Sequence, residues 1–144
     1  MFVGEYLRTR DSKGRIFIPA KLREDIAGKI IISRGFDEQC LFLYTKENWN
    51  KLEQKIFAGP VARADTQEFA RVFFGKANEE EIDPQGRIKI PQNLADFAEL
   101  GKDVVLVGVS ERIEIWAKDK WEKYSEEAES KFFKDKSKFE RLKF

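Results

Sequence analysis

The chain repeats itself, and this internal repeat constrains its fold more than any other feature. The segment from Asp11 to Pro19 matches the segment from Asp83 to Pro91 at an offset of 72 residues, with six of nine positions identical. The same offset aligns Trp49 with Trp121. A fixed offset is typical of a structural unit that is present twice. We therefore predict repeat 1 over residues 5–49, connecting helices over 50–76, repeat 2 over 77–121 and a C-terminal amphipathic helix or tail over 122–144.

Each repeat is predicted to contain short strands followed by helices. Residues 14–18 and 86–90 alternate isoleucine with other residues, which is the period of a half-buried strand, and a proline then begins a helix. Further strands are expected over 29–33, 41–44, 103–109 and 112–116, and helices over 46–56, 65–74 and 118–128. Units of this size rarely hold a core alone. The fold class is therefore mainly β with flanking helices, in which the two repeats interleave into one closed, pseudo-two-fold β-barrel.

Both repeats carry an Asp-x-x-Gly turn before the first of these strands. Asp11 and Gly14 form the first turn, and Asp83 and Gly86 form the second. Aspartate caps the backbone of a type I turn, and glycine accepts the positive φ that follows it. We assign these four residues a structural role in the turns.

The turns do not explain the arginine that follows each glycine. If the isoleucines of the strand face inward, then Arg15 and Phe17, and Arg87 and Lys89, face outward. Residues 1–34 also hold eight basic and four acidic residues, a local excess of +4 in a chain whose net charge is +1. Arginine at two matched outward positions can contact phosphates or guanine edges at two points. The candidate DNA-binding residues are Arg15, Arg87, Lys13, Lys89, Arg8, Arg10 and Lys21.

Enzymatic chemistry finds little support in the composition. The chain has no histidine and one cysteine, Cys40, which excludes histidine-based catalysis and a multi-thiolate zinc site. It contains neither a dinucleotide fingerprint nor a phosphate loop. A hydrolase that used Asp11 or Asp83 would need the turn aspartates to be free. We predict no catalytic residue, metal, cofactor or small-molecule substrate, and, because no apolar run approaches a membrane span, a cytoplasmic protein without a membrane partner.

Several other segments have simpler interpretations. Trp49, Trp121 and the apolar stripe Phe69, Val72 and Phe73 are expected in the core, and the acidic run 79–81 on the solvated surface. Residues 131–144 combine six basic residues with four phenylalanines and one leucine, which favours an amphipathic helix. We expect this tail to pack on its own barrel or on a neighbouring subunit, with a membrane surface or nucleic acid as alternatives.

The whole pattern resembles the MraZ family. The resemblance lies in Met1, Phe2 and Gly4, in the two boxes that begin at Asp11 and Asp83, in the run 104–108 and in the segment 114–116. It implies two SpoVT-AbrB-type repeats in an AbrB-like swapped-hairpin (double-split) β-barrel, with Arg15 and Arg87 as the DNA-contacting arginines. Two positions differ from the family pattern, because Ala95 stands where an arginine is usual and Arg10 where an apolar residue is common.

The same resemblance implies a function. Proteins of this family are bacterial, cytoplasmic, nucleoid-associated transcriptional regulators that form ring-like homo-oligomers. They bind short direct repeats in double-stranded promoter DNA of the division and cell-wall gene cluster. The alternative hypothesis is a protein-interaction module or antitoxin-like scaffold that uses the same fold without DNA.

Overall fold

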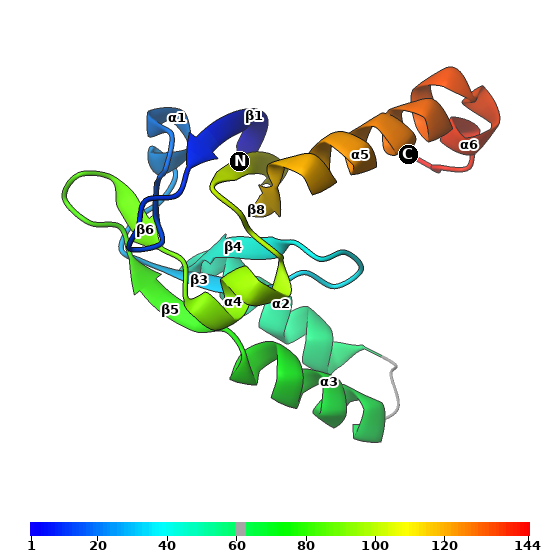
Figure 1. Cartoon of the computed structure of the whole chain (residues 1–144). Coiled ribbons are helices and arrows are strands. Elements are labelled where there is room, and N and C mark those ends of the chain that lie inside the picture. Colours follow the sequence, from blue (N-terminus) through cyan, green and yellow to red (C-terminus); the bar gives the residue numbers. More distant parts are fainter. Residues whose placement is uncertain (60–62) are drawn as a thin grey trace.

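The same order of elements, two strands, a short helix, two strands and a longer helix, occurs twice along the chain. The computed structural model describes residues 1–59 and 63–144 (Figure 1). The strands are β1 (Phe2–Thr9), β2 (Arg15–Phe17), β3 (Lys29–Arg34), β4 (Leu41–Thr45), β5 (Asn78–Glu81), β6 (Arg87–Lys89), β7 (Asp103–Ser110) and β8 (Arg112–Ala117). The helices are α1 (Ala20–Arg23), α2 (Lys46–Ala58), α3 (Arg63–Gly75), α4 (Gln92–Phe97), α5 (Lys118–Glu129), a π-helix over Ser130–Lys134 and α6 (Lys136–Glu140).

The strands of the two repeats are interleaved. The large sheet has the order β1-β7-β8-β4-β3-β5, and β2 pairs with β6 in a second sheet. Exchanging each strand of repeat 1 with its counterpart in repeat 2 gives the same order read backwards. All pairs between the repeats are antiparallel, and Ile16 lies opposite Ile88 at the centre of β2 and β6. The predicted interleaving about a pseudo-two-fold axis is therefore confirmed, and this axis passes between β2 and β6 and between β4 and β8.

The prediction of a closed barrel is wrong. β1 pairs only with β7 and β5 pairs only with β3, so in the described part of the chain the large sheet keeps two open edges. The short β2–β6 pair forms a separate sheet.

Two apolar clusters lie on the two faces of the large sheet. Alternate residues of β3 show this, because Ile30 and Ile32 belong to the cluster that includes the β2–β6 isoleucines, whereas Ile31 belongs to the cluster beneath α2 and α3. The first cluster is the shared core of the two repeats. This cluster packs against one face of the β2–β6 pair, and the other face of the pair is exposed to solvent.

The second cluster is aromatic and settles three predictions. Trp49 is buried and stacks on Phe73 with ring centroids 5.2 Å apart, so it belongs to the core as expected. Trp121 packs against Trp116 at 5.3 Å but is only partly buried at the edge of the cluster. The stripe of α3 is only partly buried. Phe73 is 3% exposed, but Phe69 and Val72 are 40% and 50% exposed, because α3 touches the molecule along one narrow edge only.

The acidic run 79–81 lies in an edge strand that the sequence analysis did not predict. Its composition is unfavourable for a strand, but Glu79 accepts a hydrogen bond from Lys46 Nζ at 2.8 Å and lies 3.5 Å from Lys29 Nζ. These cations lower the pKa of Glu79, with the Lys46 hydrogen bond as the largest cause. The strand is solvent-exposed as expected, and its charges oppose further strand pairing at this edge.

The C-terminal tail forms no continuous helix and does not pack on its own sheets. The π-helix ends at Lys134, and the next residue, Asp135, caps the N-terminus of α6 because its carboxylate accepts from the Ser137 N–H at 3.1 Å. Phe139 contacts Phe133 and Phe144, so the aromatic rings of the tail pack against one another. In Figure 1 this segment lies at the far end of α5, away from both sheets. Packing on its own barrel is thus not observed.

Candidate nucleic-acid interface

The β2–β6 pair presents a small solvent-exposed patch at the pseudo-two-fold axis. The inward isoleucines of both strands are at most 2% exposed, which directs the alternate side chains outward. Arg15 lies opposite Lys89 beside the first turn, and Phe17 lies opposite Arg87 beside the second. Phe17 is 51% exposed, an unusual state for a phenylalanine at the centre of a domain. Three cations and one aromatic ring therefore occupy the four corners of this patch.

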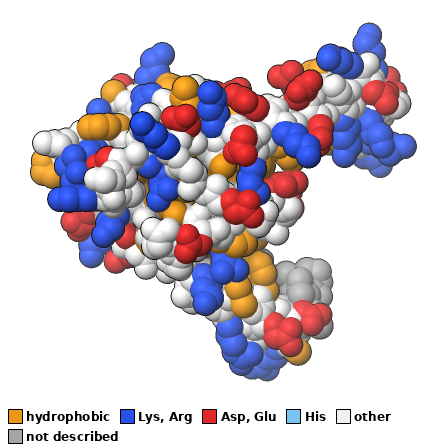
Figure 2. Space-filling model, in the orientation of Figure 1, with side chains coloured by type: hydrophobic (Ala, Val, Ile, Leu, Met, Phe, Trp, Pro, Cys, Tyr) orange, Lys and Arg blue, Asp and Glu red, His pale blue; other side chains and the backbone are white. Residues whose placement is uncertain are grey.

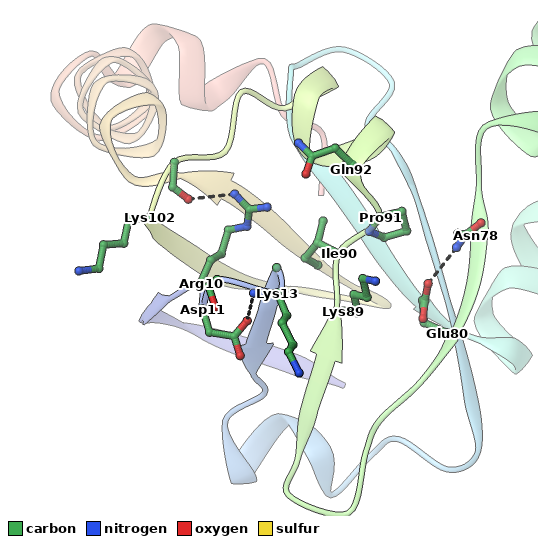
Figure 3. A pocket seen from close by; sticks show the side chains of 13 residues that line it. Arg10, Asp11, Lys13, Asn78, Glu80, Lys89, Ile90, Pro91, Gln92 and Lys102 are labelled. Carbon is green, nitrogen blue, oxygen red and sulfur yellow. Dashed lines mark hydrogen bonds between the residues drawn. The ribbon is translucent and has the colours of Figure 1, made fainter.

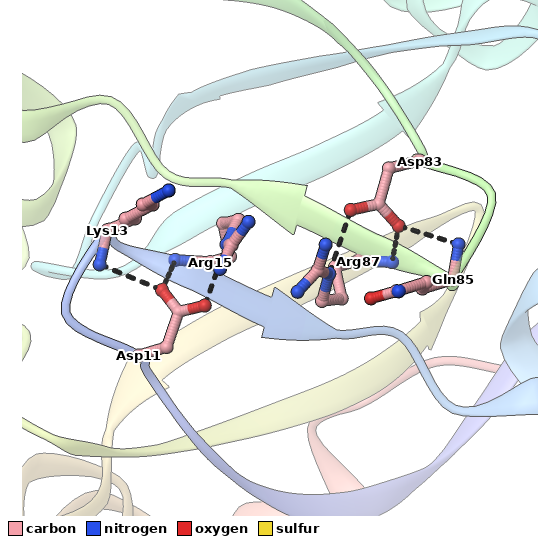
Figure 4. A network of polar contacts seen from close by, with 6 residues as sticks. All are labelled: Asp11, Lys13, Arg15, Asp83, Gln85 and Arg87. Atoms are coloured by element: carbon pink, nitrogen blue, oxygen red, sulfur yellow. Dashed lines mark hydrogen bonds and ion pairs between the residues drawn. The ribbon is translucent and has the colours of Figure 1, made fainter.

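The two turns have the same pattern of hydrogen bonds (Figure 4). Asp11 Oδ1 accepts from the backbone N–H groups of Lys13 at 3.0 Å and Arg15 at 2.8 Å. In the second turn Asp83 Oδ1 accepts from Gln85 and Arg87, both at 2.9 Å. The hydrogen bonds of the Arg15 and Arg87 N–H groups are the largest cause of the lowered pKa of each carboxyl.

The glycine at the end of each turn has a left-handed backbone. Gly14 has φ +78° and Gly86 has φ +86°, a region that residues with a Cβ enter only at a cost. The Gly14 N–H donates to the Asp11 carbonyl at 2.9 Å, and the same contact closes the second turn at 2.9 Å. Each turn leads directly into its strand, so the arginine after the glycine is the first residue of β2 or β6.

Each arginine is oriented by the aspartate of its own turn. Arg15 Nε donates to Asp11 Oδ2 at 2.7 Å, and Arg87 Nε donates to Asp83 Oδ2 at 2.8 Å. Their Nη groups have no hydrogen-bond partner within the described residues. A guanidinium held through Nε keeps its Nη1–Nη2 edge available, and this edge can donate two parallel hydrogen bonds to a phosphate or to guanine O6 and N7.

A cavity of about 810 Å³ adjoins the first turn (Figure 3). Three of the predicted DNA-binding residues line it, namely Arg10, Lys13 and Lys89, and Lys102 joins them. Arg10 is already engaged, because its Nη1 donates to the carbonyl oxygens of Leu100 at 3.1 Å and Gly101 at 3.2 Å. The cavity also contains Glu80, which accepts from Asn78 at 2.8 Å.

The remaining two predicted residues lie outside this cavity. Arg8 is on β1, where its Nη1 donates to the Leu7 carbonyl at 2.8 Å and its guanidinium lies 5.9 Å from the Tyr6 ring centre. Lys21 is exposed on α1. Lys and Arg side chains also cover the tail and other parts of the surface in Figure 2, so density of positive charge by itself does not mark the interface.

Arg23 is a site residue that the sequence analysis did not select. A Cβ built on Gly86 would overlap Nη1 of Arg23 and lie 2.7 Å from its Cζ, so this guanidinium rests directly on the second turn. Beside the first turn, Arg10 Nη2 lies 3.7 Å from the equivalent Cβ position of Gly14. In the repeat, Arg23 aligns with Ala95 and Arg10 aligns with Ile82. Each turn therefore has one neighbouring arginine, supplied from a different position in the two repeats. An alignment of the repeats shows that these arginines are not repeated, but not which turn each of them contacts.

Three further properties of the described residues concern metal-ligating groups, the cysteine and membrane-spanning helices. Residues 1–59 and 63–144 contain no group of three or more histidine, cysteine or acidic side chains that could hold a metal ion. Cys40 is buried, and burial raises the pKa of its thiol. The same part of the chain contains no helix that is long and apolar enough to span a membrane.

These features define a class of protein: a tandem-repeat, two-sheet β protein that displays a pseudo-symmetric pair of aspartate-held arginines. The model of the family described as "MraZ protein, putative antitoxin-like" matches residues 1–72 and again 73–142. The chain belongs to the MraZ family. Its two matched units divide the chain at the same offset as the repeat.

Relatives named as transcriptional regulators resemble the chain over most of its length. Three of them, all named "Transcriptional regulator MraZ", come from Desulforamulus reducens, Ligilactobacillus salivarius and Acetivibrio thermocellus. The first is 46% identical and the second 49%, each over 92% of both chains, and the third is 50% identical over 87% of both. The solution structure of PHS018 from Pyrococcus horikoshii covers 80% of this chain and 88% of its own at 16% identity, but its TM-score of 0.32 is too low to bear on the fold.

Proposed function

We propose that this protein is a transcriptional regulator that binds duplex DNA sequence-specifically through the outward face of β2 and β6. The observation that carries the proposal is the pair of arginines at equivalent positions, each held through Nε and each with a free Nη edge. One such arginine is a common surface feature, but two related by a pseudo-two-fold axis can contact the two strands of a duplex, which are also related by two-fold symmetry. The names of the relatives support the same function.

The patch at the axis is small, and this favours binding by several copies at once. The two arginine-bearing turns of one protomer can contact only a few base pairs. A homo-oligomer, which forms a ring if its contacts close, would bind several short direct repeats at once. Linked sites of this kind raise overall affinity by about 10² to 10⁴ without any new contact. The DNA that we propose is the promoter of the division and cell-wall gene cluster, and the cellular location is the cytoplasmic nucleoid.

DNA binding is tested with the purified protein and two duplexes, one from upstream of its own gene and one of scrambled sequence. Fluorescence anisotropy at two salt concentrations should show tighter binding of the upstream duplex. Arg15→Ala should lower that affinity by about 1–3 kcal/mol if the guanidinium reads a base, or make the salt dependence less steep by about one phosphate contact. Arg71→Ala, on the exposed face of α3, is the matched control. Unchanged affinity and salt dependence in a folded Arg15→Ala protein would remove the proposal.

Assembly is tested by light scattering of the full chain and of a chain that ends at residue 130. The exposed rings Phe133 and Phe144 are 74% and 94% exposed, which makes the tail, with α5, our candidate for contact with a neighbouring copy. We expect an oligomer that the truncation weakens, and binding that strengthens from one DNA repeat to three. A monomeric full-length protein would exclude the assembly while leaving the role of Arg15 unaffected.

A protein-interaction module is the second candidate function. The same exposed phenylalanines and the antitoxin-like description of the family favour it. It predicts that neither duplex binds with sequence preference and that removal of residues 131–144 abolishes capture of a protein partner.

A further inference from the structure

The pseudo-two-fold symmetry of the interface is broken in its charge. Three lysines line the cavity beside the first turn, namely Lys13, Lys89 and Lys102. Their counterparts beside the second turn are Gln85, Phe17 and Gly28, because the strand pairing makes Ile30 equivalent to Val104 and hence Gly28 equivalent to Lys102. All three cations are thus replaced by uncharged residues, although the turn, the strand pairing and the aspartate-held arginine are repeated.

The lysine next to Gly28 at the second end, Lys29, is already ion-paired. Lys29 Nζ lies 3.5 Å from the Glu79 carboxylate, which also accepts from Lys46 at 2.8 Å. Lys102 makes no ion pair within residues 1–59 and 63–144, and neither does Lys13 or Lys89. The first end therefore offers three lysine ammonium groups without a protein partner, and the second end offers none at the equivalent positions.

Two opposite charges reduce this asymmetry without reversing it. Glu80 lines the cavity of the first end, and its counterpart at the second end is Arg8. The Glu80 carboxylate already accepts from the Asn78 amide, and the Arg8 guanidinium already donates to a backbone carbonyl.

We infer that the cavity beside the first turn is the main phosphate-binding site of the protein, and that it takes the phosphodiester backbone of a duplex. Lys13, Lys89 and Lys102 supply the ammonium groups, and Arg15 lies next to Lys89 across the strand pair. The second end contributes Arg87, Arg23 and the exposed Phe17, but no lysine at the three equivalent positions. This inference rests on the proposed DNA binding and adds an uneven division of contacts within one protomer.

Salt dependence of binding measures this division directly. Each phosphate that a cation neutralises contributes about −0.9 to the slope of log affinity against log salt for duplex DNA. Between 50 and 200 mM salt, one contact therefore accounts for about a 3.5-fold loss of affinity. Over this salt range, a variant that lacks one such contact should therefore lose about 3.5-fold less affinity than the unmodified protein.

The test compares Lys102→Gln with Lys29→Gln, because Lys29 is adjacent to Gly28, the counterpart of Lys102, and is already ion-paired. Anisotropy titrations of the full chain with the scrambled duplex, across the same salt range, give the slopes. We expect Lys102→Gln, Lys13→Gln and Lys89→Gln each to flatten the slope by about one contact, and Lys29→Gln to leave it unchanged. The Glu79 carboxylate keeps Lys46 as a partner in the control. Thermal melts establish that each variant is folded.

The possible failures can be told apart. Equal changes for Lys29→Gln and Lys102→Gln, or unchanged slopes for all three cavity variants, would overturn the uneven division. If Arg15→Ala still loses affinity in that case, the proposed function stands without it. If the unmodified protein binds neither duplex, DNA binding itself fails, and the cavity variants then have no slope to change.

Discussion

Substituting alanine for the glycine of each turn should have unequal effects in the two repeats. Both glycines have positive φ, so alanine at either position is expected to cost about 1–2 kcal/mol for the left-handed backbone alone. The surroundings differ. A Cβ on Gly14 would find its nearest neighbour, the Ile90 carbonyl oxygen, at 3.4 Å, an ordinary contact. A Cβ on Gly86 would overlap the guanidinium of Arg23, which must move away.

Displacing Arg23 adds a second cost to Gly86→Ala. Nε of Arg23 is buried without a hydrogen-bond partner in the described structure, so displacing this flexible side chain breaks no hydrogen bond of Nε and loses only its packing against the turn. Contacting residues commonly show coupling energies of about 0.5–3 kcal/mol. We expect Gly86→Ala to destabilise by about 2–3 kcal/mol and Gly14→Ala by about 1–2 kcal/mol. For a chain of 144 residues, each kcal/mol corresponds to about 4 °C in Tm.

A double-mutant cycle separates the two costs. Urea unfolding at one fixed protein concentration gives the free energies of Gly86→Ala, Arg23→Ala and the double variant. Once Arg23 is truncated, Gly86→Ala should cost only what Gly14→Ala costs. An equal cost of Gly86→Ala in both backgrounds would refute a role of Arg23 at the turn. A Gly14→Ala protein that melts normally but no longer binds DNA would show that this glycine instead permits close approach of the nucleic acid.

Three further predictions concern the pH dependence, the aromatic cluster and the thiol. The pKa values of Asp11 and Asp83 are lowered in the folded protein, so the stabilisation by these carboxylates is complete above the ordinary aspartate pKa near 4 and is lost as pH falls through the folded-state pKa values. Melting temperatures should therefore decline below about pH 4 more steeply in the unmodified protein than in a variant with asparagine at both positions. Identical pH profiles of the two proteins would contradict this. Phe73→Ala should destabilise by about 3–5 kcal/mol in urea titrations, whereas Val72→Ala, half exposed on the same helix, should change stability by less than about 0.5 kcal/mol. Cys40 is 2% exposed with a raised pKa, so a thiol reagent should modify it only in denaturant, and rapid modification of the native protein would contradict its burial.

Local features of the interface follow from the sequence because they depend on neighbouring residues. The spacing of Asp11 and Gly14 is sufficient to predict a turn, since the aspartate accepts from N–H groups two and four residues later. Alternation along β2 and β6 is sufficient to predict that the isoleucines are buried, and hence that Arg15 and Arg87 face outward. The repeat itself predicts that whatever one turn does, the other can do about a pseudo-two-fold axis.

Contacts between residues distant in the chain were decided only by the tertiary structure. β5 is an acidic strand of poor propensity, and it forms because β3 offers an edge and Lys46 offers a cation to Glu79. Lys102 reaches the first turn only because β1 pairs with β7, and Arg23 reaches Gly86 only because β2 pairs with β6. Periodicity and turn chemistry act over a few residues, whereas these contacts depend on which strands meet. The sequence therefore determined the two arginine-bearing turns, and the packing of one repeat against the other determined what surrounds each of them.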